Sequence, residues 1–181
     1  MSIALHSRTR YQTPADPLDG RALRSILGSF ATGVTVATTV GANSKPVGVT
    51  ANSFSSVSMV PPLISWCLKQ SSHSLSAFRH SRRFTINVLG ASDVELCLRF
   101  AEAHPYKWCG LAHHQGTNGC PVLAQAIATI ECRLSAEHEA GDHVILIGEV
   151  ERAEAKDFAQ PLVFYRGQYY DLVGAKSTLA Q

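Results

Sequence analysis

The sequence has no long apolar segment and little net charge. In its 181 residues no run comes near the roughly 18 consecutive apolar residues that a membrane-spanning helix needs. Residues 1–17 are polar, include Arg8 and Arg10, and lack the apolar core of a secretory signal, so we expect a flexible N-terminal leader. The formal charge of +2 gives no strong attraction to polyanions. We therefore expect neither a nucleic acid nor a membrane as a partner.

Paired cysteines are also missing. The five cysteines, at positions 67, 97, 109, 120 and 132, include no Cys-x-x-Cys pair, and their number is odd. A secreted disulfide scaffold is therefore disfavoured, and reduced thiols in the cytoplasm are expected. Soft ligands do gather between positions 104 and 120, but none have the spacing of a structural zinc site, and we expect no metal. These ligands are His104, Cys109, His113, His114 and Cys120.

Three common nucleotide-binding and catalytic signatures are absent. There is no Gly-x-Gly-x-x-Gly, which argues against a Rossmann-type dinucleotide site. Gly28 and Gly33 have the spacing of a phosphate loop, but Val-Thr follows where Lys-Ser/Thr is required. Asp142 and His143 could belong to a hydrolase triad, yet the Gly-x-Ser-x-Gly nucleophile turn is missing. Any nucleotide chemistry must therefore use another kind of site.

The apolar patterns that are present predict one mainly β domain. A chain that is 45% hydrophobic and 17% charged favours a single core, which we place at residues 18–174, with a tail at 175–181. Two-residue alternation in one segment puts Phe84, Ile86 and Val88 on the same face. β-branched runs and alternation predict seven strands, the first two of them a hairpin. The strands are 33–40, 46–51, 63–68, 84–89, 126–136, 144–153 and 162–172.

Helical patterns are fewer. An apolar stripe, with Pro17 in its first turn, predicts a helix at 16–30. Shorter helices are expected at 74–79 and at 92–103, the latter opened by a capping box of Ser92 and Glu95. Residues 104–122 show no periodicity and are expected to form a long loop. Because strands and helices do not alternate, a β-barrel with a few peripheral helices is favoured over a doubly wound sheet.

Small polar residues concentrate directly after the predicted strand 46–51. Their hydroxyl and amide groups can hydrogen-bond the edge of a flat heteroaromatic ring, or a phosphate oxygen, without a cationic cradle. A Ser-rich turn explains the same composition without any ligand. The residues concerned are Thr50, Asn52, Ser53, Ser55, Ser56 and Ser58.

Seven short motifs follow one another along the chain: FATGVTV at 30–36, TANSFSSVS at 50–58, PP at 61–62, FTINVL at 84–89, GCPVL at 119–123, GDHVI at 141–145 and PLVFY at 161–165. This series resembles the short-chain flavin reductase family. The likeness extends over about residues 20–172, and although each motif is weak alone, their order is specific. Members of that family serve as the reductase component of two-component flavin monooxygenases.

The resemblance implies a Greek-key split barrel of the FMN-binding type, usually a homodimer. It implies a flavin, FAD or FMN, that is reduced by NADH or NADPH and passed to a separate monooxygenase component. His143, in the Gly-Asp-His motif, is assigned to nicotinamide binding and catalysis. The other cofactor-binding residues that we assign are Thr35, Thr50, Ala51, Asn52, Ser53, Ser55, Ser56, Cys67, Leu68, Ser72, Phe84, Asn87, Phe100 and Tyr165.

Several of these assignments have structural alternatives. Phe84 and Phe100 can be core residues, Tyr165 can close the barrel, and His143 can be a solvated residue beside a turn. Trp66-Cys67 also stands where smaller or polar residues are frequent in the family.

Other functions stay open as well. One is a flavin- or haem-binding carrier or sensor of the same fold, without reductase turnover. Another is a pyridoxamine phosphate oxidase, whose basic phosphate site could use only Arg82 and Arg83 here.

Overall fold

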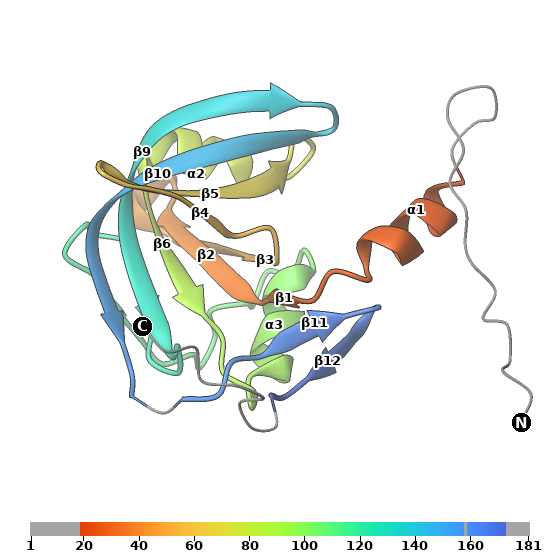
Figure 1. The fold of residues 1–181 in the computed structure, drawn as a ribbon. Coiled ribbons are helices and arrows are strands. Elements are labelled where there is room, and N and C mark those ends of the chain that lie inside the picture. The colour runs from red at the N-terminus through yellow and green to blue at the C-terminus, as the bar shows by residue number, and fades with distance from the viewer. Residues whose placement is uncertain (1–18, 158, 173–181) are drawn as a thin grey trace, which may run out of the picture.

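The computed structural model describes residues 19–157 and 159–172, so Pro17 and the predicted leader and tail lie outside the described residues. Strands dominate this part of the chain, as predicted (Figure 1). The strands are β1 (Thr32–Gly33), β2 (Thr35–Val40), β3 (Pro46–Ala51), β4 (Ser55–Met59), β5 (Pro62–Lys69), β6 (Arg83–Val88), β7 (His113–Gln115), β8 (Pro121–Leu123), β9 (Ala128–Ala140), β10 (His143–Ala155), β11 (Val163–Tyr165) and β12 (Gln168–Tyr170). The helices are α1 (Gly20–Leu27), the short 3-10 helix η1 (Ala42–Ser44), α2 (Leu75–Ser81) and α3 (Val94–Ala101).

Seven strands form one curled antiparallel sheet in the order β3-β2-β6-β9-β10-β5-β4. The predicted hairpin is confirmed, because β2 pairs with β3 along its whole length. The sheet curls until β3, at one edge, contacts β5, next to the other edge, without a ladder between these two strands. The fold is therefore a split barrel with a seam between β3 and β5. Helices α1 and α3 lie outside the curled sheet (Figure 1), and α2 packs Leu75 and Phe78 into its interior cluster.

Two apolar clusters stabilise this barrel. The larger one fills the interior around Trp66, Phe78 and Phe84, whose rings meet edge-to-face with centroids 4.9 to 6.4 Å apart. The second lies beneath α3 and includes Leu96 and Phe100. Because α3 buries one face against β3 and β2, its C-terminal end is fixed beside the seam.

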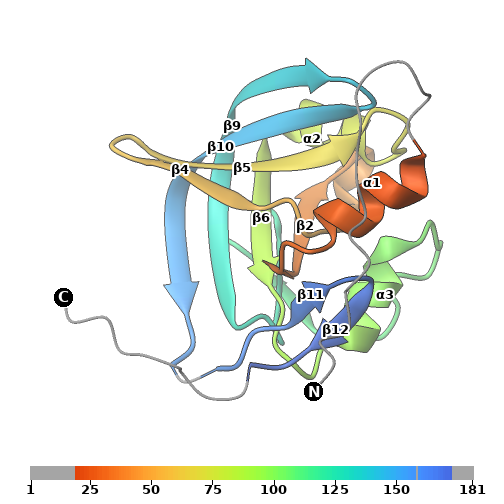
Figure 2. The same cartoon turned by 45° about the vertical axis from the view of Figure 1, so that its right-hand side comes forward.

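The hairpin of β11 and β12 packs beside α3 at this second cluster (Figure 2). The Cys97 thiol of α3 donates to the Tyr169 hydroxyl at 3.2 Å. Burial raises the pKa of Cys97, and it raises the pKa of Tyr169 to about 12. Both groups are therefore protonated at neutral pH, and this contact between α3 and β12 does not change with pH there.

The central strand β6 follows the predicted alternation. Phe84 and Ile86 are buried in the larger cluster, and Val88 packs against it. The opposite face is buried too, and there the polar side chains are hydrogen-bonded. Asn87 Nδ2 donates to the Val36 carbonyl at 3.0 Å, and Asn87 Oδ1 accepts from the Leu123 amide at 2.8 Å. A polar residue at this depth is stable because its partners replace water.

Two predicted elements differ in kind from those observed. The expected loop 104–122 contains β7 and β8, which pair with each other; each has only three residues, too few to show a period. The expected strand 162–172 is a hairpin of β11 and β12, turned at Arg166 and Gly167, which both have positive φ.

Other predicted boundaries were wrong. The first helix ends at Leu27 instead of position 30, and Asp19 caps it by accepting from the Arg21 amide at 3.0 Å. The Ser92–Glu95 capping box does not form, because α3 begins one residue later, with Asp93 at its N-cap. Asp93 instead accepts from the Gly90 amide at 2.9 Å.

Candidate active site

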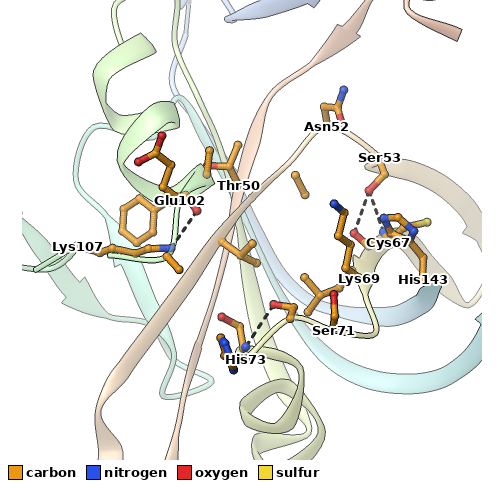
Figure 3. A pocket seen from close by; sticks show the side chains of 18 residues that line it. Thr50, Asn52, Ser53, Cys67, Lys69, Ser71, His73, Glu102, Lys107 and His143 are labelled. Atoms are coloured by element: carbon orange, nitrogen blue, oxygen red, sulfur yellow. Dashed lines mark hydrogen bonds between the residues drawn. The ribbon is translucent and has the colours of Figure 1, made fainter. Parts of the chain in front are cut away.

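A cavity of about 470 Å³ opens at the seam of the barrel, and we call it the seam pocket (Figure 3). It lies between the end of β3, the end of β5, the turn before α2, the first residue of β10 and the segment that follows α3. Its volume is in the range of small-molecule sites. Its walls are formed by Val49, Thr50, Ala51, Asn52, Ser53, Cys67, Leu68, Lys69, Ser71, Ser72, His73, Ser74, Phe100, Ala101, Glu102, Ala103, Lys107 and His143.

Ser53 joins the two strands that border the seam. Its hydroxyl accepts from the Cys67 amide at 2.9 Å and donates to the Cys67 carbonyl at 3.3 Å (Figure 3). On the same segment, the Thr50 hydroxyl donates to the Cys97 carbonyl of α3 at 2.7 Å. These bonds tie the end of β3 to both neighbouring walls, so the floor of the pocket is held in place before any ligand binds.

The wall from β5 to α2 presents hydroxyl groups and a cation. Strand alternation buries Trp66 in the core and turns Cys67 toward the pocket. Lys69 ends the strand, and the serines of residues 71–74 follow in the turn. One of them, Ser72, accepts from the Ser74 amide at 3.3 Å. Hydroxyls, amides and an ammonium group in one turn are suited to an anionic oxygen.

The wall after α3 combines an apolar ring with charged groups. Gly48 allows Phe100 to lie directly on β3, because a Cβ at that position would be 2.5 Å from the ring. Lys107 Nζ donates to the Phe100 carbonyl at 3.1 Å and lies 5.8 Å from the centre of its ring. Burial lowers the pKa of Lys107. Glu102 stands beside it on the same wall (Figure 3).

His143 reaches the pocket from a tight turn. Gly141 and Asp142 connect β9 to β10, and φ of +62° at Gly141 is a conformation that favours glycine. His143 then pairs with Lys69 of β5, at the rim of the pocket. Its Nδ1 donates to Asp142 Oδ1 at 2.7 Å, and this bond and the nearby histidine lower the pKa of the Asp142 carboxyl. The other ring nitrogen, Nε2, is then the one that can contact a ligand.

Residues 27–173 match the family model described as a flavin reductase like domain. The chain belongs to the flavin reductase family. The HsaB reductase subunit of a flavin-dependent monooxygenase from Rhodococcus jostii is 37% identical over 155 residues, which are 86% of this chain and 79% of that protein.

Solved structures of flavin reductases share the fold of this chain. Nitrilotriacetate monooxygenase component B from Mycobacterium thermoresistibile has a TM-score of 0.85 and 35% identity, covering 90% of this chain and 92% of that chain. The NADH:FAD oxidoreductase SgcE6 of Streptomyces globisporus, in complex with NAD and FAD fragments, has a TM-score of 0.84 and 32% identity. The match covers 92% of this chain and all of that chain. The split-barrel fold that the motifs implied is thus confirmed.

The seam pocket of this flavin reductase gathers residues that the sequence assigned to cofactor binding from four separate segments. The chemistry of the donor set fits a flavin: an apolar wall lies opposite small hydrogen-bonding groups, and cations stand at both ends. The assigned residues that line it are Thr50, Ala51, Asn52, Ser53, Cys67, Leu68, Ser72, Phe100 and His143.

The other assigned residues do not line the pocket. Thr35 is buried one strand away and donates to the Ala51 carbonyl at 2.7 Å. Phe84 and Asn87 lie in the interior, as described above. Ser55 and Ser56 are on β4, a strand that was not predicted, because a Ser-rich segment is typical of a turn. Tyr165 lies on β11, with its ring 6.2 Å from that of Tyr170. Their roles in cofactor binding stay predictions.

Sequence reasoning did not single out half of the pocket. Of the residues that it missed, Lys69, Glu102 and Lys107 carry charges, and Ser71 and Ser74 supply hydroxyl groups. The only signal for these residues was the cluster Ser-Ser-His-Ser at the end of a predicted strand, which equally suits the start of a helix. Nothing in the local sequence of 101–107 indicates that this segment faces β5.

The described part of the chain also bears on a metal site, a membrane-spanning helix and a basic phosphate site. No group of three or more His, Cys, Asp or Glu side chains there could hold a metal ion. Among the described helices, none combines the length and apolarity needed to cross a membrane. The basic pair considered for a pyridoxamine phosphate does not line the pocket, and Arg82 Nη2 instead donates to the Leu134 carbonyl at 3.0 Å.

Proposed function

We propose that this chain is an NAD(P)H-dependent flavin reductase that uses the seam pocket and supplies reduced flavin to a separate monooxygenase. The single observation that carries the proposal is the convergence in that pocket of hydrogen-bonding groups from β3 and β5, cations from two walls and His143 at the rim. The names of the reductase subunit from Rhodococcus and of the NADH:FAD oxidoreductase from Streptomyces support it.

The pocket divides into an apolar and an anion-binding part. Of the residues that line the pocket, Asn52 and Ser53 are proposed to hydrogen-bond the polar edge of a flavin ring, and Leu68 and Phe100 to exclude water from its faces. Lys69 and the serines of the 71–74 turn, which also line the pocket, are proposed to bind its phosphate. When bound, the flavin supplies the redox chemistry by accepting a hydride from the reduced nicotinamide. The protein needs no strong acid or base, because its contribution is to hold two rings in contact and exclude water.

His143 is proposed to position the nicotinamide nucleotide. His143→Ala is expected to raise the KM for NADH or NADPH about tenfold, which corresponds to about 1.4 kcal/mol, and to leave the Kd for flavin within twofold. The reason is that His143 stands at the rim, while the residues proposed to contact the flavin lie on other walls of the pocket. Steady-state kinetics at saturating flavin, together with flavin titration of the same variant, measure both quantities. Unchanged nucleotide kinetics would rule this role out.

The direct test of the proposed function is nicotinamide oxidation by the purified chain, with and without added FAD or FMN. Flavin-dependent loss of NADH or NADPH absorbance supports the reductase, and the apparent flavin affinities give the preferred cofactor. Stoichiometric flavin binding with no oxidation of either nucleotide would instead support the carrier or sensor.

We further propose that the protein is a homodimer. The amphipathic helix α1 buries none of its residues, and Leu27 and Phe30 at and beyond its end are 64% and 79% exposed. Figure 1 shows α1 extending away from the curled sheet. Apolar side chains displayed together in this way are typical of a protein interface. Light scattering is expected to give twice the mass of one chain, and Leu27→Glu with Phe30→Glu is expected to lower that mass to one chain.

A further inference from the structure

One wall of the seam pocket is built differently from the walls that the sheet provides. Strands β3, β5 and β10 form their walls as members of the seven-stranded sheet, whereas residues 102–107, directly after α3, pair with no strand. We call residues 102–107 the α3 strap. Its residues 102–106 are exposed, and Glu102, Ala103 and Lys107 line the pocket. Compared with the walls on the sheet, the α3 strap can therefore move with less loss of structure.

Two cations connect the α3 strap to the helix, one from each side. Arg99 Nη2, on the helix, donates to the Tyr106 carbonyl at 3.2 Å and to the Cys109 carbonyl. Lys107 Nζ, on the strap, donates back to the Phe100 carbonyl near the end of the helix, at 3.1 Å. Within the described residues, these two side chains make all the hydrogen bonds between α3 and the segment that follows it. Removing either cation therefore loosens the strap.

Arg99 acts on the pocket without lining it. The two carbonyls that it binds lie on either side of Lys107, which does line the pocket. Arg99 therefore fixes the backbone from which the Lys107 side chain extends. An ammonium group has three protons, so Lys107 can bind the Phe100 carbonyl and an anionic ligand oxygen at the same time. A cation at the C-terminal end of a helix also has the favourable sign.

The chain beyond the strap is held independently by Trp108. Its ring meets that of Phe100 edge-to-face with centroids 5.1 Å apart, and that of His113 with centroids 5.0 Å apart. Trp108 packs in this way against the apolar cluster beneath α3. Loss of the Arg99 cation is therefore expected to free residues 102–107 and to leave the chain after them in place.

We propose that Arg99 is a positioning residue that holds the α3 strap closed on the seam pocket and thereby slows the release of bound flavin. The proposal rests on the proposed function, which places a flavin in that pocket and requires it to leave for another protein. Release past this wall requires the contacts of both cations to break, while the walls on the sheet stay in place. A side chain that does not touch the flavin then sets part of its dissociation rate.

The first test needs no ligand and uses the full-length chain. Arg99→Met removes the cation and keeps the apolar stem. Arg133→Met, at an exposed arginine of the sheet that pairs with Glu149, is the matched control. Hydrogen exchange followed by mass spectrometry is expected to be about tenfold faster in residues 102–107 of Arg99→Met alone, the loss of a hydrogen bond to a charged group. Unchanged exchange there, or equally faster exchange throughout the chain, would overturn the proposal.

The second test measures flavin release by stopped-flow displacement of bound FMN, and then of bound FAD. Arg99→Met is expected to raise the dissociation rate about tenfold, and Arg99→Lys, which keeps the charge, is expected to raise it less. Arg133→Met is expected to leave the rate within twofold. An unchanged rate in Arg99→Met, or the same increase in Arg133→Met, would show that Arg99 does not control release.

A double variant tests whether the two cations hold the same strap. If they do, Arg99→Met combined with Lys107→Met is expected to release flavin more slowly than the product of the two single effects predicts, because either change alone already opens the strap. Independent effects that multiply fully would contradict a shared strap. A chain that binds no flavin would contradict the proposed function instead, and hydrogen exchange in residues 102–107 would still show whether Arg99 holds them.

Discussion

Phe84→Ala is expected to lower the free energy of unfolding by about 3–5 kcal/mol, the usual loss for a large aromatic residue in a core. The side chain is 1% exposed, and its ring lies against Trp66 and Phe78. It also lies on bare backbone, because a Cβ at Gly148 would be 2.4 Å from the ring. Neighbours fixed in this way cannot collapse into the space left by the ring. Urea unfolding followed by circular dichroism measures the loss.

The same variant separates the two interpretations of Phe84. If the residue is part of the core, the molecules that remain folded bind flavin with unchanged affinity, and Phe78→Ala, at a core residue never assigned to the site, gives the same pattern. A Phe84→Ala chain of normal stability that binds flavin weakly would instead restore the cofactor-stacking assignment. We expect the first result, because the aromatic cluster lies inside the barrel and the seam pocket lies at its border.

Strands were predictable where the sequence pattern and the environment agree. In β5, a short run rich in apolar residues was recognised as a strand, and burial alternates along it, with Ile64, Trp66 and Leu68 buried. In β2, both faces are buried, and the run was recognised by its β-branched residues instead. Short paired strands such as β7 and β8 could not be predicted. Three residues are too few to show an alternating pattern, and only pairing with the neighbouring strand defines their conformation. Strand β4 was missed because its serines favour turns, whereas pairing with β5 decides its conformation.

The site was predictable where a recognisable motif of the sequence contributes to it. The cluster of small polar residues and the family motifs together indicated Thr50 and Ser53, and the family resemblance indicated Cys67; the curled sheet brings all three to the same seam. The same motifs also contain residues such as Asn87, whose amide satisfies buried backbone groups. A motif cannot distinguish a residue that binds a ligand from one that satisfies buried backbone groups, because both roles require the same hydrogen-bonding side chains. Lys107 could not be found, because only the path of the chain after α3 places it opposite β5.

Gly48→Ala is expected to weaken flavin binding about tenfold, or about 1.4 kcal/mol, and to cost about 1–3 kcal/mol of stability by overpacking. The added methyl group would be 2.5 Å and 2.7 Å from two atoms of the Phe100 ring, and 3.1 Å from Trp108. Phe100 is fully buried, and the centroid of its ring lies 5.1 Å from that of Trp108. The ring therefore has no space to move aside within its own cluster. The remaining direction is toward the seam pocket, which Phe100 lines.

Two further variants test this cause. Phe100→Leu in the Gly48→Ala background removes the atoms that clash, so the double variant is expected to regain part of the flavin affinity that Gly48→Ala loses. Gly33→Ala is the matched control, because a Cβ there meets nothing within 4 Å, and its stability and flavin affinity are expected to stay unchanged. Strictly additive losses in the double variant would show that Gly48 does not act through Phe100. A partial recovery would show that one glycine on β3 sets the shape of the pocket by letting an aromatic ring lie on the strand.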